Sequence, residues 1–62
     1  MPRFKEVRHE RGFSQEALAK ASHISRRTIA KCDHGYRPTH PLRAALARAL
    51  RVTDTELFDN AD

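Results

Sequence analysis

The sequence repeats one helix-start pattern three times, which limits the folds available to a chain of 62 residues. Ser14, Ser25 and Thr53 each have a side-chain oxygen that can accept a hydrogen bond from the first turn of a helix. Each also has an apolar residue directly before it and another four positions after it, the spacing of a hydrophobic staple. Glu56 completes a capping box with Thr53. The pattern therefore predicts three helix starts.

Glycine positions predict where helices end, and a proline position indicates one further helix start. Gly12 and Gly35 stand where helices are expected to end, because glycine readily adopts the conformation that closes them. Thr39 is a further N-cap candidate, with Pro41 tolerated in the first turn. We predict an all-α fold of five helices at about residues 3–11, 15–21, 26–34, 40–50 and 54–58. The short connection between the second and third helices is typical of a helix-turn-helix.

Apolar residues recur at helical spacing and indicate one small core. A chain of this length buries only about 60% of its unfolded surface, so we expect a single domain over residues 1–62. The helix at 40–50 has apolar residues at i, i+3, i+4, i+7 and i+8, which gives it one apolar face. The predicted core residues are Phe4, Val7, Phe13, Leu18, Ile24, Ile29, Leu42, Leu46, Leu50, Val52 and Leu57.

The helix predicted at 26–34 has an outward face that folding does not explain. With Ile29 and Cys32 toward the core, an advance of about 100° per residue turns the opposite side outward. That side holds Arg27, Lys31 and His34, with Ala30 beside them and Arg26 at the flank. Cations in the first turn oppose the helix dipole by about 0.3–1 kcal/mol each, and Arg27 also repels Lys31. A bound polyanion would relieve this repulsion, although a solvated basic face without a partner is the alternative.

Charge is divided unevenly along the chain. Lys and Arg number 12 against 8 Asp and Glu, so the net charge is +4. All of the bases lie in residues 1–51, which sum to +8, whereas residues 52–62 sum to −4. A small basic protein points first to a nucleic acid, and the predominance of Arg suits phosphate and guanine. We expect the acidic C-terminal end, residues 52–62, to face away from DNA.

Five segments, taken in order, carry a resemblance to a known family. They are F-S-Q-E-A-L-A-K from Phe13, I-S-R-R-T-I-A-K from Ile24, G-Y-R-P from Gly35, L-R-A-A-L-A-R-A-L-R-V from Leu42 and T-D-T-E-L-F from Thr53. Together they resemble the Cro/Xre-type (lambda repressor-like) helix-turn-helix DNA-binding family over about residues 3–58. The resemblance implies a compact five-helix DNA-binding domain whose helix-turn-helix is formed by the second and third helices.

The resemblance also implies roles for individual residues. Gln15 would grip a backbone phosphate, and Arg26 or Arg27 is suited to a bidentate contact with guanine. The base-contact candidates are Ser25, Arg26, Arg27, Ala30, Lys31 and His34. The phosphate-contact candidates are Gln15, Thr28, Tyr36, Arg37 and Arg43. A homodimer on a pseudo-palindromic operator is implied, with Arg51, Thr55 and Phe58 as interface candidates, although Phe58 alternatively caps the core.

Three positions depart from the family pattern. His23 stands at a turn position that needs a positive φ and usually holds Gly, so we expect some strain there. Cys32 replaces an aliphatic core residue and fits as a small hydrophobe. Asp33 replaces a common Glu, so we expect a salt bridge at this position to be shorter or absent.

Catalytic and metal-binding functions lack the residue spacing that they need. The potential metal ligands are His9, His23, His34, His40 and Cys32. They do not match a zinc motif, because Cys32-x-His34 has no second pair. Consecutive helical residues point about 100° apart, so Cys32, Asp33 and His34 cannot form a triad. We expect no enzyme activity, cofactor, metal or small-molecule ligand.

The remaining alternatives concern location and partner. The longest apolar run spans only residues 44–47, so we expect no transmembrane helix or secretory signal, and a cytoplasmic, nucleoid-associated protein. A helix cannot read the deep, narrow groove of duplex RNA. A protein-interaction module or antitoxin-like partner would not need the cations of 26–34. We therefore predict sequence-specific binding of double-stranded DNA by a small prokaryotic, phage or plasmid transcriptional regulator, acting as a repressor.

Overall fold

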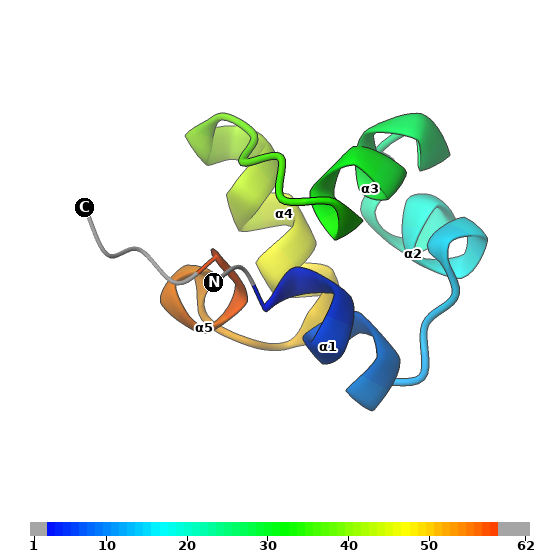
Figure 1. The fold of residues 1–62 in the computed structure, drawn as a ribbon, viewed down its shortest axis with the longest axis horizontal. Coiled ribbons are helices and arrows are strands. Elements are labelled where there is room, and N and C mark those ends of the chain that lie inside the picture. Colours follow the sequence, from blue (N-terminus) through cyan, green and yellow to red (C-terminus); the bar gives the residue numbers. More distant parts are fainter. Residues whose placement is uncertain (1–2, 59–62) are drawn as a thin grey trace.

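The computed structural model describes residues 3–58, which form five α-helices and no strand. The helices are α1 (Phe4–Glu10), α2 (Gln15–Ser22), α3 (Arg26–Asp33), α4 (His40–Leu50) and α5 (Asp54–Phe58). The all-α prediction is confirmed, and each predicted boundary lies within one residue of the observed one. In Figure 1, α4 lies between α5 on one side and the α2–α3 pair on the other. None of the helices within residues 3–58 has the length and apolar content needed to cross a membrane.

Two serine caps start the pair of helices that forms the helix-turn-helix. Ser14 Oγ accepts a hydrogen bond from the backbone N–H of Ala17 at 3.0 Å. Ser25 Oγ accepts one from the backbone N–H of Thr28 at 3.2 Å. Both bonds satisfy a first-turn donor that has no partner inside the helix, so the predicted starts of α2 and α3 are confirmed.

The two threonine caps differ from each other. Thr53 and Glu56 form the predicted capping box: Glu56 N–H donates to Thr53 Oγ1 at 3.1 Å, and Thr53 N–H donates to Glu56 Oε1 at 2.9 Å. Thr39 occupies the N-cap position of α4, but its side chain makes no capping hydrogen bond. The predicted N-cap position of Thr39 is therefore confirmed, without a side-chain hydrogen bond. Pro41 lowers the need for such a bond, because it removes one of the first-turn N–H groups.

The turn between α2 and α3 is three residues long and is held by the core. His23 has φ 61°, the left-handed conformation that its position was predicted to need. Ile24 follows it with 8% of its surface exposed, so its side chain anchors the turn. Because α3 begins two residues after Ile24, the turn leaves α3 little freedom to rotate relative to α2. The outward side of α3 therefore has a fixed direction.

Every helix contributes residues to the core, and an aromatic pair joins the first helix to the last. Its buried apolar residues are Phe4, Val7, Leu18, Ile24, Ile29, Cys32, Leu46, Ala47, Leu50, Leu57 and Phe58. Phe13, Leu42 and Val52 were predicted to belong to the core and are only partly buried against it. The rings of Phe4 and Phe58 stack with their centroids 5.8 Å apart, and this contact joins α1 to α5.

Candidate nucleic-acid interface

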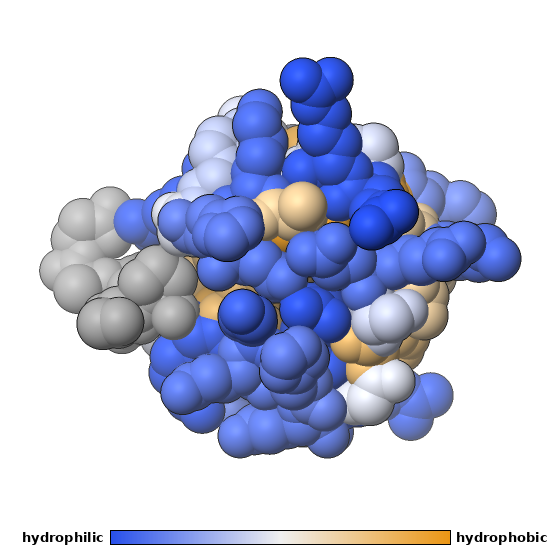
Figure 2. Space-filling model, turned by 45° about the vertical axis from the view of Figure 1, so that its right-hand side comes forward, coloured by the Kyte–Doolittle hydropathy of each residue, from blue (hydrophilic) through white to orange (hydrophobic). Residues whose placement is uncertain are grey.

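The outward side of α3 is a basic face, as its sequence predicts. Ile29 and Cys32 anchor the helix, with 0% and 1% of their surfaces exposed. On the opposite side, Arg26, Arg27, Lys31 and His34 are exposed and surround the half-buried Ala30. We call these five residues the basic face. The view in Figure 2 brings the α2–α3 side of the molecule forward and is covered mostly by hydrophilic side chains.

The start of α3 adds two hydroxyl groups beside the basic face. Ser25 is exposed and Thr28 is half-buried. The Ser25 hydroxyl also donates to Thr28 Oγ1 at 2.9 Å. The structure thus brings all six predicted base-contact residues to one end or one side of a single helix.

A glycine-closed turn ends α3 and brings Lys31 against Tyr36. Gly35 has φ 103°, which glycine adopts at little cost because it has no Cβ. Its N–H donates to the carbonyl of Cys32, and the N–H of Tyr36 donates to the carbonyl of Lys31, both at 3.0 Å. These are the two bonds of a Schellman motif. The Nζ of Lys31 lies 5.2 Å from the centroid of the Tyr36 ring, and Tyr36 is 45% exposed.

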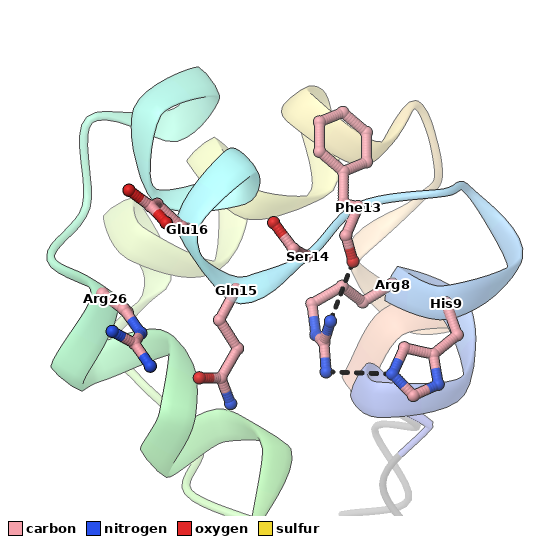
Figure 3. Close-up of a pocket in the computed structure, with 7 residues that line it drawn as sticks. All are labelled: Arg8, His9, Phe13, Ser14, Gln15, Glu16 and Arg26. Atoms are coloured by element: carbon pink, nitrogen blue, oxygen red, sulfur yellow. Dashed lines mark hydrogen bonds between the residues drawn. The ribbon is translucent and has the colours of Figure 1, made fainter.

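A cavity of about 420 Å³ opens beside the first turn of α2 (Figure 3). Its lining residues come from α1, α2, α3 and the α1–α2 loop: Arg8, His9, Phe13, Ser14, Gln15, Glu16 and Arg26. The side chain of Gln15 lies between those of Arg8 and Arg26 in this view. The N-terminus of a helix carries partial positive charge, so the first turn of α2 and the charge of Arg26 favour an anion here, whereas the Glu16 carboxylate in the same lining opposes it.

Arg8 is buried at the back of this cavity and pairs with Asp33. Its Nε donates to Oδ1 of Asp33 at 3.1 Å, and its Nη2 donates to Oδ2 at 2.6 Å. A third bond runs from Nη1 to the carbonyl of Phe13 at 2.8 Å. The Arg8 and Asp33 side chains are only 6% and 3% exposed. Of the two outcomes expected at Asp33, an absent salt bridge is contradicted, because the long Arg8 side chain reaches the carboxylate inside the protein.

The surroundings of Asp33 set its protonation. Burial opposes ionisation, but the hydrogen bonds from Arg8 and Gln15 and the charge of Arg8 outweigh it, so the pKa of Asp33 lies below its ordinary value. Sequence reasoning missed Arg8 because its partner lies 25 positions away, in a different helix. Only the packing of α1 on α3 brings the two side chains together.

Gln15 is oriented by the same carboxylate. Its Nε2 donates to Asp33 Oδ2 at 2.9 Å. A carboxamide nitrogen carries two hydrogens, so a second N–H remains for an acceptor in the cavity. The phosphate contact of Gln15 stays a prediction. The hydrogen bond to Asp33 already holds the Gln15 side chain in the lining of the cavity.

Arg43, another predicted phosphate contact, braces the connection between α3 and α4. Its Nε donates to Asp54 Oδ2 at 3.2 Å, and its Nη1 donates to the carbonyl of Pro38 at 2.9 Å. These bonds tie the α3–α4 loop to α4 and α5. Arg37 is exposed on the same loop. A phosphate contact of Arg43 stays a prediction, but two of its donor nitrogens already serve the fold.

The residues predicted for a dimer interface do not form one exposed set. Arg51 and Thr55 are exposed. Phe58 is 5% exposed and stacks on Phe4, which favours the alternative in which Phe58 caps the core.

Comparison with protein families gives a match that spans all five helices. The model of a helix-turn-helix domain family matches residues 3–58. The chain belongs to this helix-turn-helix family. The match includes the basic face, the cavity and the three-residue turn between α2 and α3. A search of curated proteins finds no match to the chain.

Proposed function

We propose that residues 1–62 form one sequence-specific double-stranded DNA-binding domain of the Cro/Xre type. It would serve a small prokaryotic, phage or plasmid transcriptional regulator that acts as a repressor in the cytoplasm, on the nucleoid. The observation that carries this proposal is the basic face of α3. Two arginines in a first turn are unfavourable for a free helix, and DNA would remove that cost. In helix-turn-helix proteins the second helix of the motif lies in the major groove.

In the proposed complex, α3 reads bases and α2 crosses the backbone. Arg26 or Arg27 donates a bidentate pair of hydrogen bonds to guanine O6 and N7. Ala30 allows the helix close to the groove floor because its side chain is a single methyl group. Gln15, at the mouth of the cavity, donates to a phosphate without reading sequence.

The operator is proposed to be a pseudo-palindrome bound by two copies of the chain. Half-sites of such dimers lie about 34–36 Å apart, one turn of DNA. Arg51 and Thr55 carry the interface in this proposal, since both are exposed. Sedimentation with and without DNA tests the stoichiometry, and one chain per operator would remove the dimer from the proposal.

Selection of bound duplexes from a random library tests the function. Affinities for the selected and a scrambled duplex are then compared for Arg26→Ala, Arg27→Ala, Gln15→Ala and Arg48→Ala. Arg48 is an exposed cation on α4 and serves as the matched control for lost charge. Arg27→Ala should lower the ratio of the two affinities by about tenfold or more, the size of a bidentate guanine contact. Gln15→Ala should weaken both duplexes equally.

Two results would contradict the proposal. An unchanged affinity ratio in both Arg27→Ala and Arg26→Ala would remove the base contact. Failure to enrich any duplex would favour the protein-interaction or antitoxin-like function instead. Salt provides a further check, because log affinity should fall with log salt at a slope near −0.9 for each phosphate neutralised.

A further inference from the structure

We propose that Tyr36 is a positioning residue for Lys31. Its ring holds the Lys31 ammonium at the C-terminal end of the basic face, so that Lys31 selects sequence at one fixed place in the groove. The inference rests on the proposed function, since it gives Lys31 a contact with bases. It assigns Tyr36 a role through its ring, whereas the sequence predicted a phosphate contact, which would use its hydroxyl.

The backbone at the end of α3 forces these two side chains together. In a Schellman motif the residues at the positions of Lys31 and Tyr36 come into contact, and the pair is commonly hydrophobic. Here a cation lies over an aromatic ring, with Nζ 5.2 Å from the centroid. The contact follows from the two hydrogen bonds that close the turn at Gly35.

The ring stands on a braced loop. Pro38, two residues after Tyr36, is among the fully buried residues. The carbonyl of Pro38 accepts a hydrogen bond from Arg43 Nη1 at 2.9 Å. The loop is thus fixed on one side by the closing turn of α3 and on the other by α4, so Tyr36 offers Lys31 a fixed surface.

A fixed position matters more for lysine than for arginine. The ammonium is a point charge on a flexible stem, so the place where it selects sequence depends on where the stem is held. A free lysine would lose rotamer freedom on binding DNA, and a lysine already held over a ring loses less. Arg27, one turn earlier, repels Lys31 and disfavours the opposite direction. A cation–π contact also strengthens when water leaves the interface.

The contact itself is tested without DNA by NMR. Protons that lie over an aromatic ring resonate upfield, so the side-chain methylene protons of Lys31 should be shifted upfield in the wild type. Tyr36→Phe keeps the ring and should preserve this shift, whereas Tyr36→Leu should abolish it. Leucine also restores the hydrophobic pair common in this motif, so thermal unfolding should confirm that the variant folds. Unshifted Lys31 protons in the folded wild type would overturn the proposal.

The role is tested by selection of duplexes with five proteins: the wild type, Tyr36→Leu, Tyr36→Phe, Lys31→Met and the double variant Tyr36→Leu/Lys31→Met. Tyr36→Leu should reduce base preference by about two- to fivefold, the size of an exposed cation–π contact, at the same operator positions that Lys31→Met affects. Tyr36→Phe should restore that preference. In the Lys31→Met background, Tyr36→Leu should have no further effect.

Arg26→Ala provides the matched control, because Arg26 is an exposed cation of the basic face but is not an i,i+4 neighbour of Lys31, the cation that lies over the ring. Its effect should add to that of Tyr36→Leu. The positioning role is overturned if Tyr36→Phe loses as much preference as Tyr36→Leu, or if Tyr36→Leu and Lys31→Met have additive effects. If the wild type selects no duplex, both the proposed function and this role of Tyr36 are overturned. The upfield NMR shift of Lys31 would still be present in that case, which shows that the function has failed and not the contact.

Discussion

The guanidinium of Arg8, in α1, donates two hydrogen bonds to the carboxylate of Asp33, the last residue of α3. The same carboxylate accepts a bond from Gln15, the first residue of α2. One buried acidic group thus joins three helices. It fixes the direction of α3 and orients the amide that lines the cavity, so stability and the candidate interface depend on the same contact.

Asp33→Asn should lower the free energy of unfolding by about 3–5 kcal/mol, because it leaves the buried charge of Arg8 unpaired. A core of this size supplies only about 3–5 kcal/mol, so the variant should be largely unfolded at room temperature. Circular dichroism without denaturant measures the folded fraction of the variant, and urea unfolding gives the free energy of unfolding of the wild type. Glu6→Gln is the control, since the Arg3–Glu6 pair spans 3.6 Å with side chains 50% and 72% exposed. It should cost at most about 1 kcal/mol. Equal stability of the two variants would contradict the importance of the buried pair.

Asp33 should also make the free energy of unfolding depend on pH. Because its pKa in the folded protein lies below the ordinary value of 3.8, the unfolded chain binds the proton more readily. The stabilisation is therefore fully present above the unfolded pKa and is lost as the pH falls through the lower, folded pKa. NMR titration of the carboxyl carbon should show this low midpoint, and Gln15→Ala should raise it by removing a hydrogen bond.

Glu56 serves as the internal control for that titration. Hydrogen bonds from the backbone N–H and the hydroxyl of Thr53 hold its pKa below the ordinary value. Gln15 does not take part in this capping box. A midpoint that moves at both Asp33 and Glu56 in Gln15→Ala would indicate a general loss of structure rather than a lost bond to Asp33.

Features set by neighbouring residues were predictable from the sequence, whereas contacts between distant side chains were not. The Ser14 and Ser25 caps each join residues three positions apart, and the buried side of α3 follows from helical periodicity. The Arg8–Asp33 pair depends on how α1 packs on α3, which no local pattern encodes. The contact between Lys31 and Tyr36 lies between these cases: Gly35 signals a Schellman motif, whose geometry pairs residues five positions apart.

His23→Gly should stabilise the protein by about 0.5–1 kcal/mol. The left-handed conformation of His23 costs a residue with a Cβ about 1 kcal/mol or more, and glycine removes this strain. Glycine also has more conformational freedom in the unfolded chain, but this loss cancels only part of the stabilisation. His23→Ala keeps the Cβ and should bring no gain. Urea unfolding of the three proteins measures the difference. If the glycine variant is no more stable than the alanine variant, the turn between α2 and α3 is not strained at His23.

Cys32 should react with thiol reagents only when the protein unfolds. Its side chain is 1% exposed, and burial together with the charge of Asp33 raises the pKa of its thiol to about 11. At pH 8 the reactive thiolate is therefore scarce as well as inaccessible. The rate of modification by an aromatic disulfide should be far below that of a cysteine peptide and should rise with urea in parallel with the loss of circular dichroism.

Gly12→Ala is the control for this prediction. Gly12 has a positive φ and open space around it, so the substitution strains the turn after α1 without touching Cys32. That variant should raise the reaction rate only as far as it lowers stability, whereas fast modification of the fully folded protein would show that α3 opens locally at Cys32.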